Sequence, residues 1–199
     1  AAGSFGYFVS PIYTRFALIE FGWNTTLLIF AVMIIFGLMI SFFLTTPIEE
    51  TKDEEKNGQT AIEAIKEAFS NKSFRYLTLG FFVCGWHIAL VATHIPMHIR
   101  DSGLEDWTAT AILALIGLFN VFGTLTSGYL STKISKKKLL SVIYLLRGVS
   151  IMYFIYMPPS VMNALIFGAT FGFLWLSTVP PTSGIVAVSY TLLTLPTKA

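Results

Sequence analysis

Long apolar runs separated by short polar stretches make up most of the chain. Residues 25–46 and 107–132 contain no charged side chain, and residues 139–157 contain only Arg147. A hydrocarbon core of about 30 Å is crossed by about 20 apolar residues in a helix. Each run therefore predicts a membrane-spanning helix, because an open strand would leave its backbone polar groups unpaired in lipid.

The pattern predicts an all-α membrane protein with about six transmembrane helices. The first run is expected to be the tail of a helix, residues 14–24 a short turn, and Pro180-Pro181 an interruption of the last run. In chain order, the six segments are expected over residues 1–13, 25–46, 76–99, 107–132, 139–157 and 161–187.

Composition agrees with the bilayer as solvent. Hydrophobic residues form 54% of the chain and charged residues 12%, with a mean hydropathy of +0.70, whereas a soluble domain has about twice that charge. The net charge of +2 is too small to indicate nucleic acid as a partner. The single cysteine, Cys84, forms no disulfide framework or metal spacing and is expected to be a buried thiol.

Lysine and arginine are concentrated in two loops, and such an excess is typical of cytoplasmic loops. The loops 47–75 and 133–138 hold nine of these residues, against two on the opposite side, Arg15 and Arg100. Both basic loops are therefore expected in the cytoplasm, and residues 100–106 and 158–160 outside. The nine are Lys52, Lys56, Lys66, Lys72, Arg75, Lys133, Lys136, Lys137 and Lys138.

The loop 47–75 contains one expected helix. Thr60 and Glu63 form a capping box, and apolar residues recur on one face of the helix that it would start. These residues are Ile62, Ile65 and Phe69. Two interpretations stay open, a helix lying along the membrane surface and a solvated linker helix.

Four stretches of the sequence resemble the major facilitator superfamily, from the fifth to the tenth of its twelve helices. They are Ala2-Gly3-Ser4-Phe5-Gly6-Tyr7 with Phe21-Gly22-Trp23, the charged loop 47–75, Gly80-Phe81-Phe82-Val83-Cys84-Gly85-Trp86-His87 with Ala92-Thr93-His94-Ile95-Pro96, and Gly128-Tyr129-Leu130-Ser131-Thr132-Lys133-Ile134-Ser135-Lys136-Lys137. The third stretch resembles bacterial members related to monocarboxylate carriers.

The resemblance implies a domain organisation. Residues 1–46 would be the last two helices of the N-terminal bundle, 47–75 the cytoplasmic linker, and 76–187 the first four helices of the C-terminal bundle. The chain is then a fragment, whose partners include the missing helices of the same protein, in a bacterial inner membrane. The tail 188–199 resembles a translated sequencing-library adapter and is expected to be non-native.

The last stretch is similar to the superfamily's cytoplasmic gating loop. The resemblance assigns Gly128, Lys133, Lys136 and Lys137 to that motif. Thr132 stands where the motif has an acid, and Ser135 replaces its second glycine. This departure weakens the gating role that the carboxylate has in the family.

Three histidines, His87, His94 and His98, share one helical face, since their spacings of seven and four residues return to within about 20° of the start. They span roughly 16 Å of helix axis, so they cannot bind one metal ion. Imidazole titrates near physiological pH, so a mid-membrane His87 is a candidate for proton relay or substrate binding. His94 is a second candidate, and His98 lies near the outer surface.

Asn120 and Thr124, one turn apart, match positions where monocarboxylate carriers have an aspartate and an arginine. Threonine cannot supply the donors of a guanidinium, so the lactate-type mechanism loses support. Asn120 is expected either to bond substrate or to bond a neighbouring helix.

Arg147 costs at least about 2.5 kcal/mol at mid-membrane if unpaired. The alternatives are substrate binding and a structural role, either pairing or extension of the side chain toward the membrane surface, with Tyr144, Ser150 and Tyr153 as local partners. Trp175 is a further candidate, because the tenth helix of the family usually faces the central cavity.

These observations favour a secondary active transporter that moves a small organic solute by alternating access. No catalytic residues, metal set or cofactor motif is found, so an enzyme is not expected. The expected partners are a small-molecule substrate, with a coupled proton as an open alternative, and the lipid bilayer. The alternatives are a proton-coupled monocarboxylate carrier and a membrane receptor or scaffold without transport.

Overall fold

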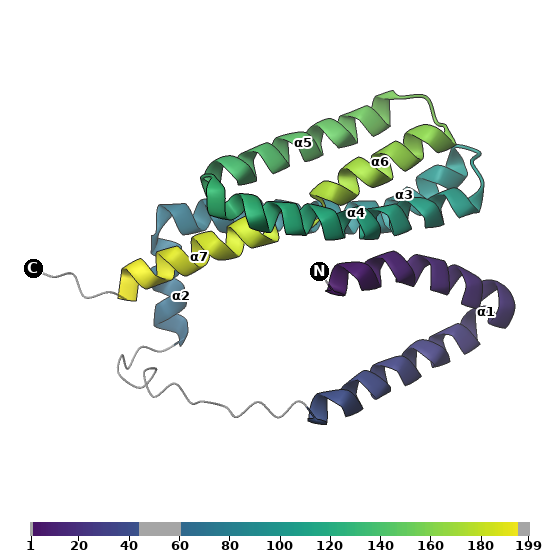
Figure 1. Ribbon diagram of the computed structural model, residues 1–199, viewed down its shortest axis with the longest axis horizontal. Helices are drawn as coiled ribbons and strands as arrows, with labels where there is room; N and C mark the ends of the chain where they lie inside the picture. The colour runs from purple at the N-terminus through teal and green to yellow at the C-terminus, as the bar shows by residue number, and fades with distance from the viewer. Residues whose placement is uncertain (1, 44–60, 195–199) are drawn as a thin grey trace, which may run out of the picture. The chain divides into compact units, whose positions relative to one another are not determined.

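The computed structural model describes residues 2–43 and 61–194, and all regular secondary structure in them is helical. Within these residues, five helices are long and apolar enough to cross a membrane, so the predicted all-α membrane fold is confirmed. The helices are α1 (Ala2–Phe43), α2 (Ala61–Ser70), α3 (Lys72–Asp101), α4 (Asp106–Lys133), α5 (Lys136–Tyr156), α6 (Val161–Leu174) and α7 (Val179–Thr194), as Figure 1 shows.

The described residues form two compact parts, one of residues 2–13 and 80–194, the other of residues 14–43 and 61–79. The larger part holds most of α3, all of α4 to α7, and the start of α1. It carries every candidate site residue that the sequence indicates.

The predicted turn over residues 14–24 is wrong in extent. The chain is helical through this stretch except at Gly22, whose φ of 71° and ψ of 177° are not helical. Glycine adopts positive φ at little cost, whereas the polar side chains around it stay within the helix. Gly22 thus divides a candidate span of 39 residues, about twice the length that a membrane requires, near the boundary predicted between the first two segments.

The short helix α2 confirms the helix predicted in the loop 47–75. Its apolar residues lie on one exposed face, and the aromatic ring of Phe69 meets that of Phe74 edge to face at 5.4 Å. Asn71 separates α2 from α3 and accepts hydrogen bonds from the amides of Ser73 and Phe74, which caps the start of α3. The Thr60 half of the capping box lies outside the described residues.

Within the larger part, α5 and α6 run alongside α4 (Figure 1). Glycines allow the close approach of α6 to α4, because a Cβ at Gly172 would lie 2.5 Å from the Cα of Ile116, and one at Gly168 would lie 3.2 Å from that of Ile112. Small residues of this kind are typical of helix interfaces in membranes. The core between α3, α4 and α6 comprises Val91, Ile95, Ile99, Ala109, Ile112, Ile116, Ala164, Phe167, Phe171 and Trp175.

The last predicted segment is interrupted, but not at its prolines. Helix α6 ends at Leu174, residues 175–178 are not helical, and Pro180 and Pro181 lie in the first turn of α7. Proline is tolerated in the first turn because amides there have no partner within the helix. Helix α7 continues to Thr194, beyond the expected end of the segment at residue 187.

Candidate functional site

The non-helical residues 175–178, called here the α6–α7 break, follow from the two prolines. In an α-helix the carbonyl of residue i accepts the amide hydrogen of residue i+4. Pro180 and Pro181 have no such hydrogen, and their rings clash with the carbonyls four residues earlier. The carbonyls of Leu176 and Ser177 therefore lose their helical partners, and the chain leaves the helix upstream of the prolines.

Five consecutive carbonyls around the break accept other donors. Two of these carbonyls have donors within four residues. The Ser177 hydroxyl donates to the Phe173 carbonyl at 2.5 Å, and the Val179 amide donates to the Leu176 carbonyl at 3.0 Å. The other three, those of Leu174, Trp175 and Ser177, accept hydrogen bonds from side chains of α4 and α5. The break is thus a point where polar groups from several helices meet inside the membrane-spanning part.

Arg147 of α5 supplies two of these hydrogen bonds. Its Nη2 donates to the carbonyls of Leu174 and Trp175, each at 2.6 Å, and the side chain is only 1% exposed. These carbonyls form the C-terminus of α6, where the helix dipole favours a positive charge. Hydrogen bonds to a charged group contribute about 1.5–3 kcal/mol each, enough to offset the cost of about 2.5–3.5 kcal/mol for a charge at mid-membrane.

Of the three local partners predicted for Arg147, only Tyr144 is confirmed. Its guanidinium lies over the ring of Tyr144, 5.5 Å from the centroid. Ser150 instead bonds the Thr170 hydroxyl at 3.1 Å, and the Tyr153 hydroxyl donates to Asn163 at 3.0 Å. The prediction failed for these two because α6 offers both hydroxyls nearer partners.

Asn120 of α4 is completely buried and bonds two other segments. Its Oδ1 accepts the amide hydrogen of Leu176 in the break at 3.0 Å, and its Nδ2 donates to the hydroxyl of Ser4 on α1 at 3.0 Å. One turn further, Thr124 donates to the carbonyls of Asn120 and Val121 in its own helix. The structure therefore brings Asn120, but not the Thr124 hydroxyl, to the break.

Cys84 and Thr178 complete this polar cluster, and the sequence did not single out Thr178. The Cys84 sulfur lies 3.4 Å from the Thr178 hydroxyl and accepts from Arg147 Nη1 at 3.2 Å. Cys84 is 2% exposed, which confirms the predicted burial, and its thiol also takes part in hydrogen bonds. We call Cys84, Asn120, Ser127, Arg147 and Thr178 the break cluster.

Two buried polar atoms near the cluster have no hydrogen-bond partner among the described residues. They are Nε of Arg147 and Nδ1 of His87. His87 lies three residues after Cys84 and therefore on the same side of α3. Buried polar atoms of proteins nearly always have a partner, so each of these atoms has capacity for a further one.

The other candidates lie apart from the break cluster, with one exception. Trp175, the first residue of the break, is 2% exposed and packs against Phe171 and Tyr7, with ring centroids at 5.3 and 6.0 Å. His94 is exposed on α3.

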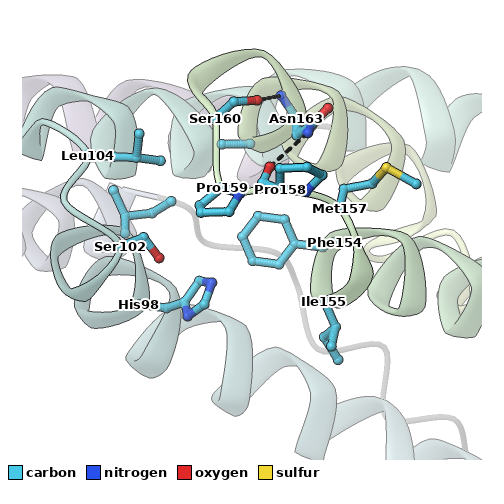
Figure 2. Close-up of a pocket in the computed structure, with 12 residues that line it drawn as sticks. His98, Ser102, Leu104, Phe154, Ile155, Met157, Pro158, Pro159, Ser160 and Asn163 are labelled. Atoms are coloured by element: carbon cyan, nitrogen blue, oxygen red, sulfur yellow. Dashed lines mark hydrogen bonds between the residues drawn. The ribbon is translucent and has the colours of Figure 1, made fainter.

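His98 lies at the opposite end of α3 from Lys72, beside a cavity of about 90 Å³ between residues 98–104 and 154–164. Its ring meets that of Phe154 edge to face at 5.4 Å. Figure 2 shows the residues that line this cavity. The side-chain Nδ2 of Asn163 donates to the Pro158 carbonyl, and the backbone amide of Asn163 donates to the Ser160 hydroxyl. His98 thus belongs to a site separate from the break.

The residues that the resemblance assigns to the gating-loop motif lie in the last two turns of α4 and the first turn of α5. A Cβ at Gly128 would meet no atom within 4 Å. The Lys133 ammonium lies 5.9 Å from the centre of the Tyr129 ring, and Lys137 lies in the first turn of α5. The Lys136 side chain crosses α7 at Gly184, where an added Cβ would lie 2.7 Å from its Cε.

The fold and the break are those of a polytopic membrane protein, and comparison with known families identifies which kind. A model of the Major Facilitator Superfamily matches residues 1–193. The chain belongs to this superfamily. No curated protein and no solved structure matches the chain.

Members of the Major Facilitator Superfamily are transporters, not enzymes; they sit in the lipid bilayer and bind small-molecule substrates. The predicted resemblance to the superfamily is therefore confirmed, as is the prediction of a multi-pass membrane protein. The subgroup, the position within the twelve helices and the roles of individual residues stay predictions.

Proposed function

We propose that this chain is part of a secondary active transporter that moves a small organic solute by alternating access, and that the break cluster belongs to its solute pathway. The observation that carries the proposal is the convergence of polar side chains from α3, α4 and α5 on one interrupted membrane helix. Polar side chains at this depth are costly, and interrupted helices in transporters form substrate and ion sites.

In this proposal, the atoms with spare hydrogen-bonding capacity face the solute pathway. His87 Nδ1 and Arg147 Nε are buried and have no hydrogen-bond partner among the residues that the structure describes, so they can bond a solute or a water molecule that enters beside α3. Asn120, whose amide donates to Ser4 and accepts from Leu176, holds the break in place. His94 and Trp175 remain candidate pathway residues, Trp175 because it begins the break.

The orientation and location of the chain are part of the proposal. The loops 47–75 and 133–138 lie in the cytoplasm of a bacterium, the protein spans the inner membrane, and helix α2 lies along its surface. The exposed apolar face of α2, with Ile62 78% exposed, supports this position, since α3 begins two residues after α2 ends. The chain corresponds to the fifth to tenth helices, and further helices of the same protein close the pathway.

The experiment that tests the function is solute uptake by the complete protein in liposomes. A panel of labelled organic acids, amino acids, sugars and amines is screened for saturable uptake and for exchange between the two sides. We expect His87→Ala to lower uptake of the solute found, while His98→Ala, beside the separate cavity, leaves it unchanged. Absence of exchange for every solute class would favour a receptor or scaffold.

One observation favours the second candidate, a proton-coupled monocarboxylate carrier. Residues 107–187 contain no aspartate or glutamate. Among the described residues, the buried charge of Arg147 is balanced by carbonyl dipoles, a thiol and the face of the Tyr144 ring, none of them a carboxylate. A carboxylate solute would balance it better. Lactate uptake that rises with an inward proton gradient would select this candidate over the general one.

A further inference from the structure

The contacts of Arg147 resemble those of a bound cation more than those of an ordinary ion pair. Its guanidinium is enclosed by the carbonyls of Leu174 and Trp175, the sulfur of Cys84 and the face of the Tyr144 ring. None of these groups carries a formal positive or negative charge when the thiol is protonated. The break thus forms a cation site whose occupant is attached to α5.

The two helices that meet at the break are held unequally. At Gly168 and Gly172, the backbone of α6 lies so close to the backbone of α4 that there is no room for a side chain. A small movement of α6 toward α4 would therefore make the two backbones clash. Helix α7 instead meets the flexible Lys136 side chain at Gly184. Helix α7 also packs on α4 and α5, and the hydrogen bonds at the break add to this packing in setting the direction in which α7 leaves α6.

Three side chains serve carbonyls or amides of the break, but Arg147 differs from the others. Ser127 and Asn120 each make one hydrogen bond to it, to Ser177 and Leu176. Arg147 joins two successive carbonyls through a single nitrogen and reaches α3 through another. Without it, both carbonyls would be buried without a described donor, at the end of α6 where the dipole is most negative.

We propose that Arg147 is a positioning residue for transport: its guanidinium is a tethered cation that fixes the course of the chain from α6 into α7. The inference rests on the proposed function, since transport is the activity that the fixed break serves. Arg147→Ala would leave a vacated site of guanidinium size, lined by two carbonyls and a thiol. Free guanidinium should bind there, whereas urea, its uncharged counterpart of the same shape, should not.

The experiment compares uptake by the complete protein and three variants in liposomes, with and without millimolar guanidinium or urea. Arg147→Ala should lower uptake by about tenfold or more. Guanidinium should restore a measurable part of it, and urea none. Arg147→Lys should fall between, because an ammonium lacks the planar fork that spans several acceptors. Arg100→Ala, which removes an exposed arginine paired with Asp106, is the control and should match the wild type.

A second measurement does not depend on transport. The thermal unfolding midpoint of purified Arg147→Ala should rise with guanidinium and not with urea, because a ligand that binds only the folded state stabilises it. If the wild type transports no solute, the proposed function fails while this result still tests the tethered cation.

Several outcomes would overturn the inference. They are wild-type uptake by Arg147→Ala, equal effects of guanidinium and urea on it, and an Arg147→Lys variant with the uptake and unfolding midpoint of the wild type. If Arg147→Ala cannot be purified, the lysine variant decides the question: a lowered midpoint that guanidinium leaves unchanged, together with full uptake, would show that Arg147 only stabilises the fold.

Discussion

The side chain of Asn120 joins Ser4 to the backbone of Leu176, with both hydrogen bonds at 3.0 Å. One amide group in the middle of α4 thereby connects the first turn of α1 with the interrupted stretch after α6. Its acceptor and one donor are both used inside a completely buried environment. Asn120 is thus a link between helices, which is the more common role of a membrane asparagine.

Replacing Asn120 should therefore destabilise the protein more than replacing its neighbour. We expect Asn120→Leu to lower the free energy of unfolding by about 1–3 kcal/mol, because the amide of Leu176 and the hydroxyl of Ser4 lose their partner. Thr124→Val is the matched control, since that hydroxyl bonds only carbonyls of its own helix. Thermal unfolding in detergent measures both, and equal midpoints would contradict the linking role.

Glycine substitutions should separate the α4–α6 interface from open helix surface. Gly172→Ala places a Cβ 2.5 Å from the Cα of Ile116, so the helices must move apart, at a cost of about 1–3 kcal/mol. Gly148→Ala on α5 meets nothing within 4 Å and should stabilise by up to about 1 kcal/mol through helix propensity. The unfolding midpoints should shift in opposite directions, and a lower midpoint for Gly148→Ala would show that an atom covers that surface.

His87 should matter to transport more than His98. The Nδ1 atom of His87 is buried without a described partner near the break, whereas His98 packs on Phe154 beside a separate cavity. In the complete protein, His87→Ala should reduce uptake or remove its pH dependence between about pH 5 and 8, where imidazole titrates. His98→Ala should change neither.

The comparison requires matched amounts of both variants in the membrane. Uptake by the two variants that is equal and near wild type across this pH range would reject a functional His87, which would then be a packing residue.

Both basic loops should lie on the cytoplasmic side. In a Cys84→Ser background, cysteines placed at Lys56 and Lys137 should resist an impermeant thiol reagent in intact cells, whereas one at Glu105 should react. All three should react after the cells are opened. Labelling of the cysteine at position 137 in intact cells would show that this loop lies outside, which contradicts the predicted orientation.

Much of the fold follows from local rules that the sequence makes visible. Apolar length predicts where the spanning helices lie, and Pro180-Pro181 predict an interruption of the last one. The error in its position has a physical cause, because a proline disturbs the carbonyls four residues upstream while fitting the first turn that follows. Likewise, only Gly22 leaves the helix in the stretch read as a turn.

The partners within the site depend on packing between distant segments. Missing N–H groups at the two prolines imply that the carbonyls of Leu176 and Ser177 need donors, and this signal was available. That Ser127 and Ser4 contribute was not predictable, since Ser127 lies 50 residues from the carbonyl it bonds and Ser4 lies 116 residues from Asn120. No periodicity or motif relates such positions, which meet only when the helices pack.

The dependence of the Ser177 carbonyl on Ser127 has a consequence for sequence variation. The carbonyl needs an outside donor only because residue 181 is a proline. A relative with another residue at that position would regain the amide hydrogen that closes the helix, and its residue 127 would be free to become alanine. Among relatives, proline at 181 and a hydroxyl at 127 should therefore be gained and lost together.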